Sequence, residues 1–251
     1  MPSRVYVLSS LTPYIERARA FSGWDHSFLN IRPLDGPLPW DYEAVARRHA
    51  AAATTVLDVG TGGGERYAKI AGGVPGRFVA TEEWGVNARV AHERLQPLGI
   101  PVARAQSMRL PFRQSSFDLF LSRHEAIDPV ECDRVLARGG VFLTQQCSPR
   151  DWEELRRFFP RKTVHPQHDV LYPEGFRGMG YEVGFQRHDY RVAFGSLGDL
   201  VFMLMTAPWT IPDFDPQLEL DALMAVEAEL STPDGIVLSE GRYLLEARKP
   251  R

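Results

Sequence analysis

The sequence of 251 residues predicts an α/β fold with a parallel sheet and helices on both faces, and three observations support this. Short apolar runs alternate along the chain with stretches of helical periodicity, an order typical of parallel sheets. A glycine-dense turn follows the first strand of this series, as in nucleotide-type binding sites. The composition, 44% apolar and 24% charged, is ordinary for a globular protein. We therefore expect one domain with a large core.

Each element is expected for a local reason. Proline and glycine near 33–39 end an N-terminal leader, and a helix over 40–53 leads into the sheet. Seven short apolar runs bounded by turn residues predict strands at 55–59, 77–81, 101–105, 117–122, 140–145, 181–187 and 242–248. Helical periodicity predicts helices at 64–72, 85–96, 128–137, 151–159 and 197–205.

The first of these strands carries an acid directly before the glycine turn. Asp58 stands two residues before Gly60, and the turn continues as Thr61-Gly62-Gly63-Gly64. A dinucleotide site needs the spacing G-x-G-x-x-G, with a pyrophosphate on the next helix. A carboxylate at this position would repel a pyrophosphate, whereas it suits a cationic amino-acid group. The turn therefore favours a ligand with such a group over NAD.

A second acid ends the next strand. The apolar run 77–81 leads into Glu82, at the spacing where such sites place a residue that accepts both ribose hydroxyls. Glu83 is the adjacent rival, but alternation along a strand would turn it to the other side.

The glycine turn resembles the first motif of class I S-adenosylmethionine-dependent methyltransferases. Leu110 to Ser122 looks like the family's Leu-Pro-Phe loop and Phe-Asp strand, and Glu131 to Leu143 looks like its Arg-Val-Leu-x-Pro-Gly-Gly segment. The resemblance covers roughly residues 40–150 with specific motifs. It implies a Rossmann-like, mostly parallel sheet of seven strands, the last of them antiparallel. It also implies an enzyme that uses S-adenosylmethionine.

The resemblance further implies which residues bind the cofactor. Gln106 stands where the family usually has an Asp for the adenine amino group, and its side-chain oxygen can accept the same proton. Arg138 replaces the usual proline before the glycine pair, which alters a turn. The expected cofactor-binding residues are Asp58, Gly60, Thr61, Gly62, Gly64, Glu82, Glu83, Gln106, Ser107, Met108 and Ser122.

The loop after the fourth strand, 122–125, is where catalytic side chains are expected. His124 is the first candidate for a general base, because its pKa lies in the neutral range. Arg123 could hold a substrate carboxylate in a bidentate fork, and Glu125 is a rival base. Alternatively, His124 caps the helix that begins near Asp128, or packs beside the cofactor.

The segment 194–241, between the last two strands, is too long for a plain connection and predicts an α-helical lid. Trp209 and Phe214 are candidate substrate contacts, unless they only pack the lid onto the sheet. His165 is a third candidate, in a proline-containing loop with His168 and Asp169. The spacing of these residues does not establish a metal site, and none is expected. The expected organisation is a leader over 1–39, which covers the cofactor, and a methyltransferase domain over 40–251.

Charge and composition bear on the methyl acceptor. A net charge of −3 and a pI near 6.2 give no broad basic surface for nucleic acid. DNA is further disfavoured because the loop 122–125 lacks the Asn/Asp-Pro-Pro-Tyr/Phe tetrad of amine methylation. Cys132 and Cys147 also lack the Pro-Cys context of cytosine C5 methylation, and both are expected in the core.

We therefore expect a cytoplasmic enzyme, not bound to a membrane, that methylates oxygen, nitrogen or carbon of a small-molecule metabolite by direct displacement. Three alternatives remain. One is an RNA methyltransferase that uses a patch of basic residues at 156–162. The second is a non-catalytic S-adenosylmethionine-binding module, and the third a nicotinamide dehydrogenase. The oligomeric state does not follow from the sequence.

Overall fold

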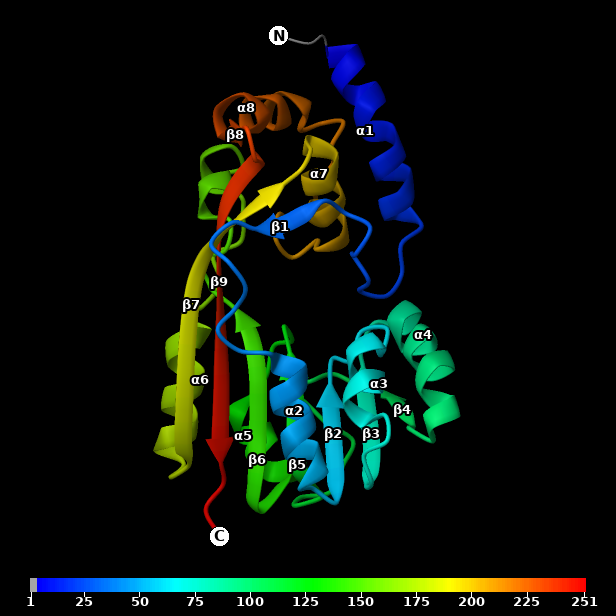
Figure 1. Ribbon diagram of the computed structural model, residues 1–251, viewed down its shortest axis with the longest axis vertical. Helices are drawn as coiled ribbons and strands as arrows, with labels where there is room; N and C mark the ends of the chain where they lie inside the picture. Colours follow the sequence, from blue (N-terminus) through cyan, green and yellow to red (C-terminus); the bar gives the residue numbers. More distant parts are fainter. Residues whose placement is uncertain (1–3) are drawn as a thin grey trace.

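A computed structural model of the protein describes residues 4–251, which form an α/β fold around one mixed β-sheet (Figure 1). The strands are β1 (Ile31–Pro33), β2 (Thr55–Val59), β3 (Arg77–Glu82), β4 (Val102–Arg104), β5 (Phe117–Arg123), β6 (Leu136–Cys147), β7 (Glu182–Phe194), β8 (Ser231–Thr232) and β9 (Gly235–Arg248). Their order is β1-β7-β9-β6-β5-β2-β3-β4, and β8 pairs with β9.

The sheet confirms the mostly parallel core with a reversed strand near its end. β4, β3, β2, β5 and β6 run parallel, whereas β9 is antiparallel to both of its main neighbours, β6 and β7. The expected count of seven strands was wrong, because the described chain has nine. The two additional strands, β1 and β8, are two or three residues long. Pairing with β7 and β9 defines them, and their own sequences carry no strand pattern.

The helices of the chain are α1 (Arg4–Arg19), α2 (Tyr42–Ala51), α3 (Glu65–Ala71), α4 (Gly85–Leu95), α5 (Pro129–Val135), α6 (His168–Gly178), α7 (Leu197–Thr206) and α8 (Leu220–Leu230), with short 3-10 helices η1 (Gln96–Leu98) and η2 (Glu153–Arg157). On one face of the core sheet, α2, α3 and α4 bury an apolar cluster. On the other face, α5 and α6 bury a second cluster. Both faces are therefore covered, as parallel strands require.

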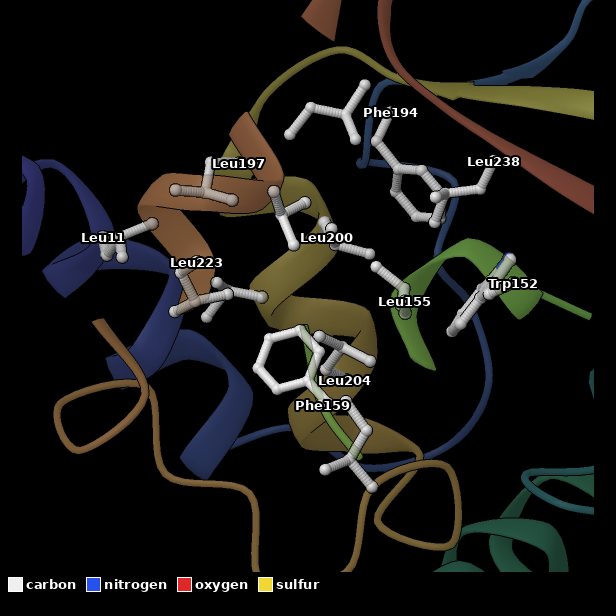
Figure 2. Close-up of a cluster of buried hydrophobic side chains, with 14 of the residues drawn as sticks. Leu11, Trp152, Leu155, Phe159, Phe194, Leu197, Leu200, Leu204, Leu223 and Leu238 are labelled. Carbon is white, nitrogen blue, oxygen red and sulfur yellow. The ribbon is translucent and has the colours of Figure 1, made fainter. Parts of the chain in front are cut away.

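A third apolar cluster lies outside this core. β7 and β9 extend past the core strands, and α1, α7, α8 and η2 pack around their far ends (Figure 1). Figure 2 shows how Leu11 of α1, Leu200 and Leu204 of α7 and Leu223 of α8 meet there. We call the four helices α1, α7, α8 and η2 together the helical unit. The leader and the segment between the last two long strands thus share one apolar core.

Some helices differ from the sequence expectation. α1 was not expected, because its residues show little amphipathic periodicity and include Pro13. The helix expected at 151–159 is the short 3-10 helix η2. His168 and Asp169 were expected in a loop, but they form the first turn of α6. No helix within residues 4–251 is long and apolar enough to cross a membrane.

Candidate functional site

The glycine turn after β2 depends on backbone angles that favour glycine. Gly60, Gly62 and Gly64 have φ of 68°, 62° and 78°, in the left-handed region that costs other residues free energy. The backbone N–H of Thr61 donates to the carbonyl of Thr81 at 3.0 Å, which ties the turn to β3. The turn is therefore held at the carboxyl edge of the sheet, where open α/β sheets bind their ligands.

Asp58 lies in β2, one residue before the strand ends, and only 8% of its surface is exposed. Burial raises its pKa to about 7, because the ionised carboxylate loses hydration. The negative charge of Glu82 adds to this rise. A cationic ligand at this position would favour the ionised form.

Glu82 ends β3, next to β2 in the sheet. Its carboxylate accepts the backbone N–H of Gly62 at 2.7 Å and that of Trp84 at 3.0 Å. Burial raises its pKa as well. The two acids expected from the sequence therefore stand on adjacent parallel strands and face the same glycine turn. Glu83 is exposed, and the side-chain amide of Gln106 donates to it at 2.8 Å.

The loop after β4 lies on the same edge of the sheet. Ser107 is buried, and its hydroxyl donates to the carboxylate of Glu125 at 3.1 Å. The backbone N–H of Leu110 donates to Glu131 at 2.6 Å, and Arg134 donates to the carbonyl of Leu110 at 3.0 Å. The Leu-Pro-Phe motif is thus fixed to α5. Met108, one residue after Ser107, is half exposed.

The last residue of β5, Arg123, and the first two residues of the loop that follows, His124 and Glu125, lie at this edge. His124 has φ of 60°, and its backbone N–H donates to the carbonyl of Gln145 at 2.9 Å. Asp128 caps α5 by accepting the N–H of Val130, so the alternative that His124 caps this helix is wrong. His124 is exposed at the surface, but nearby protein atoms remove part of the hydration of its ring. This loss of hydration and the cation of Arg123 hold its pKa below its usual value.

Glu125 packs directly on the glycine turn. A Cβ atom added to Gly60 would lie 2.6 Å from the Cγ of Glu125, so the two residues are in close contact. Burial raises the pKa of Glu125, which keeps more of it protonated near neutral pH than an exposed glutamate. Beside them, Ser122 is fully buried, and its hydroxyl has no hydrogen-bond partner among the described residues.

The residue that contacts the glycine turn from the leader was missed by sequence reasoning. A Cβ atom added to Gly62 would lie 2.2 Å from Cδ1 of Trp24. The leader is anchored there by Gly23, whose backbone N–H donates to the side chain of Asn87 in α4 at 2.9 Å. No local pattern near Trp24 signals this contact, because only the tertiary fold creates it.

The candidate substrate residues fall into different environments. Trp209 is 52% exposed, and its ring centroid lies 5.6 Å from that of Trp24. Phe214 is instead partly buried in the core of the helical unit, against Phe159 at 5.9 Å. His165 is partly buried, in a segment that Thr163 ties to the carbonyl of Trp209 at 2.7 Å. Residues 4–251 contain no group of three or more side chains suited to hold a metal ion.

The cysteines depart in part from expectation. Cys132 is buried in the core, as expected. Cys147 is exposed at the end of β6, so the expectation that both are core thiols was wrong. The physical reason is that Cys147 is the last residue of β6, where the continuous burial of this strand ends.

Comparison with known families agrees with this geometry. Residues 57–144 match the methyltransferase domain family, and this range contains the glycine turn, both acids and the loop 122–125. The chain therefore contains a methyltransferase domain of the S-adenosylmethionine-dependent type, and S-adenosylmethionine is the cofactor that this family implies. No curated protein matches the chain.

Solved structures share the fold at low sequence identity. The YcgJ protein of Bacillus subtilis is 18% identical with a TM-score of 0.63, over 84% of this chain and 98% of its own. A methyltransferase candidate from Bacillus halodurans C-125 is 18% identical with a TM-score of 0.57, over 83% and 99%. The [4+2]-cyclase SpnF is 17% identical with a TM-score of 0.54, over 96% and 92%. A cyclase among these structures means that the fold alone does not define the reaction.

The residues present fit this cofactor. Two buried carboxylates flank the turn, which suits one cationic group and one set of hydroxyl groups. Within residues 4–251 the buried hydroxyl of Ser122 has no hydrogen-bond partner, and a buried polar group of this kind calls for a ligand or a water molecule. Asp58, Glu82 and the glycine turn would hold the cofactor between them.

Proposed function

We propose that this protein transfers the methyl group of S-adenosylmethionine by direct displacement to oxygen, nitrogen or carbon of a small molecule. The observation that carries the proposal is the pair of buried acids, Asp58 and Glu82, on adjacent parallel strands at one glycine turn. The proposal includes a methyltransferase domain over 40–251, covered by the leader (1–39) and the segment 194–241, and a cytoplasmic location.

Each acid has a separate role in this proposal. Asp58 would pair with the ammonium group of the methionine part, because its carboxylate is buried and favours a cationic partner. Glu82 would accept the ribose hydroxyls with the oxygen lone pairs that its two backbone donors leave free. The cofactor supplies an electrophilic methyl group on a sulfonium. The protein then has mainly to hold the accepting atom in line with that methyl group.

Glu125 is better placed than His124 to accept a proton from the acceptor. Glu125 contacts Gly60 in the turn, whereas His124 lies beside the side chain of Gln145, with Nε2 of each at 3.3 Å. The pKa of His124 is lowered, which makes it a weaker base than a free histidine, and the pKa of Glu125 is raised, which makes its carboxylate a stronger base than a free glutamate. A base is needed only where the acceptor must lose a proton.

A small acceptor is favoured over RNA by the pairing of the basic residues. Arg156 pairs with Glu153 at 3.6 Å, Arg157 pairs with Glu229 at 3.6 Å, and Arg161 pairs with Glu219. Lys162 is buried. Carboxylates beside these cations lower the positive potential that a phosphate would meet. RNA binding that falls strongly with added salt would instead favour the alternative of an RNA methyltransferase.

The direct test is a search for the product. The protein is incubated with S-adenosylmethionine that carries an isotopically labelled methyl group and with a metabolite extract, and labelled products are sought by mass spectrometry. The Glu82→Ala variant is the control, because it should bind the cofactor at least about fivefold more weakly and form less product when the cofactor is limiting. A labelled small molecule whose yield falls in this variant supports the proposal. Cofactor binding without any labelled product would indicate a non-catalytic binding module.

A further inference from the structure

A cavity of about 560 Å³ opens at the carboxyl ends of β5 and β6, beside the start of α2. Its walls include the aromatic side chains of Trp40 and Tyr42, the amide of Gln145 and the guanidinium groups of Arg66 and Arg123. Tyr42 is fixed by a hydrogen bond of 3.1 Å from its hydroxyl to the carbonyl of Ser122. The cavity is thus next to the loop that carries the candidate base.

Arg123 is the uncompensated charge of this cavity. Within residues 4–251 its guanidinium forms no ion pair with a carboxylate and no hydrogen bond, and its Nε atom is buried. Burial and the nearby cation of Arg66 lower its pKa to about 10, so Arg123 still carries its charge at neutral pH. Arg123 as a whole is half-buried, and a guanidinium that loses part of its hydration without gaining a partner is destabilising.

The neighbours of Arg123 are already engaged. Arg66 pairs with Glu43 across the cavity wall, and Gln145 accepts the indole N–H of Trp40 at 2.8 Å. Asp58 interacts with Arg123 only at longer range, because no ion pair joins them. The cavity therefore presents one unpaired positive charge, one neutral ion pair and two aromatic walls.

We propose that this cavity is a binding site for a carboxylate, with Arg123 as its anchor. The proposal rests on the proposed function, since it assigns part of a ligand to that same site. A single unpaired cation matches a monoanion such as a carboxylate, whereas a phosphate dianion would keep a surplus negative charge near Glu43 and Asp58. The planar fork of arginine donates two parallel hydrogen bonds to a carboxylate.

Two ligands could supply this carboxylate. One is the methionine part of the cofactor, whose ammonium group is assigned to Asp58. The other is an acidic methyl acceptor, held in the cavity by Arg123. Both have the same chemistry at Arg123, so the experiment must separate them.

The first measurement compares two adenosyl thioethers by calorimetry. S-adenosylhomocysteine carries the carboxylate and 5′-methylthioadenosine lacks it. If Arg123 binds the cofactor, Arg123→Met should lower the affinity for S-adenosylhomocysteine by about tenfold or more, the usual effect of losing a charged hydrogen bond. The affinity for 5′-methylthioadenosine should stay unchanged. Arg66→Gln is the matched control, because it removes a cation that is already paired in the same cavity.

The second measurement tests whether Arg123 binds the carboxylate of an acidic methyl acceptor. Thermal unfolding is followed with S-adenosylhomocysteine present and with added benzoate or acetate, which should raise the Tm of the unaltered protein but not that of Arg123→Met. Without any ligand, Arg123→Met should raise the Tm and Arg66→Gln should not, because only the first removes a half-buried charge that has no partner. The proposal is overturned if Arg123→Met changes neither adenosyl binding nor the response to both acids. A protein that binds no adenosyl compound but responds to the acids through Arg123 would refute the proposed function alone.

Discussion

The carboxyl edge of the core sheet and the helical unit differ in how their residues are brought together. At the sheet edge, Asp58 and Glu82 lie at the ends of neighbouring strands, and the turn between them belongs to one short motif. In the helical unit, Tyr14 of α1 meets Ser196 at the start of α7, 182 residues further along the chain. The edge is therefore specified locally, whereas the helical unit depends on long-range packing.

The largest expected effects come from truncating one buried leucine in each region. Leu57 and Leu200 are both fully buried, in β2 and α7 respectively. Each change to alanine should lower the free energy of unfolding by about 2–5 kcal/mol, because a cavity replaces the side chain. Denaturant titration measures this loss. Leu200→Ala should keep its affinity for S-adenosylhomocysteine within about twofold, because distant sites act independently. A large loss of affinity in Leu200→Ala would show that the two regions are coupled.

Gly62→Ala should have the next largest effect. It forces alanine into a left-handed backbone, at about 1–2 kcal/mol, and directs its methyl group into Trp24. Gly36→Ala is the matched control, because Gly36 also has positive φ, at 90°, but nothing lies within 4 Å of an added Cβ. The free energy of unfolding should fall more in Gly62→Ala, and adding Trp24→Ala should recover part of that difference. Equal losses in both single variants would argue against the close contact of the leader with the turn.

This contrast also explains how much the sequence could predict. The glycine turn, both acids and the seven expected strands follow from patterns within about 20 residues, since they depend on local backbone geometry and strand ends. Trp24 could not be found in this way, because its contact with Gly62 is made by a leader that α1 and α4 hold in place. Phe214 looked like a substrate contact from its aromatic surroundings, but the structure places it inside the helical unit. Its partner Phe159 is remote in sequence, so only the fold reveals the difference.

The raised pKa of Asp58 predicts a pH dependence at the sheet edge. Its folded-state pKa of about 7 lies above the usual 3.8, so the folded protein retains this proton where the unfolded chain loses it. Stability should therefore fall as the pH rises from about 4 to about 7, and Asp58→Asn should remove this contribution. Binding of S-adenosylmethionine requires the ionised form, so its affinity should rise with pH up to about 7 and then level off. Calorimetry from pH 6 to pH 8 tests this, and a flat profile in the unaltered protein would contradict it.

The smallest expected effects concern two half-exposed tryptophans, one in each region. Trp84 follows Glu82 at the start of α4, whereas Trp209 follows α7. Replacing either by alanine should change the free energy of unfolding by less than replacing a buried residue. Trp84→Ala should weaken the binding of S-adenosylhomocysteine a few-fold, because Trp84 is joined through its backbone N–H to Glu82, the acid assigned to the ribose. Trp209→Ala should leave that affinity unchanged and raise the KM for the methyl acceptor. The reverse pattern would interchange the two assignments.

The central claim is that Asp58 and Glu82 hold S-adenosylmethionine at the glycine turn. Calorimetric titration of Asp58→Ala and Glu82→Ala with this compound tests it most directly, with Glu93→Ala, an exposed acid of α4, as control. Each of the two site variants should lose more than about 1 kcal/mol of binding free energy, a factor of at least about five, while the control binds normally. Unchanged affinity in both site variants would contradict the claim.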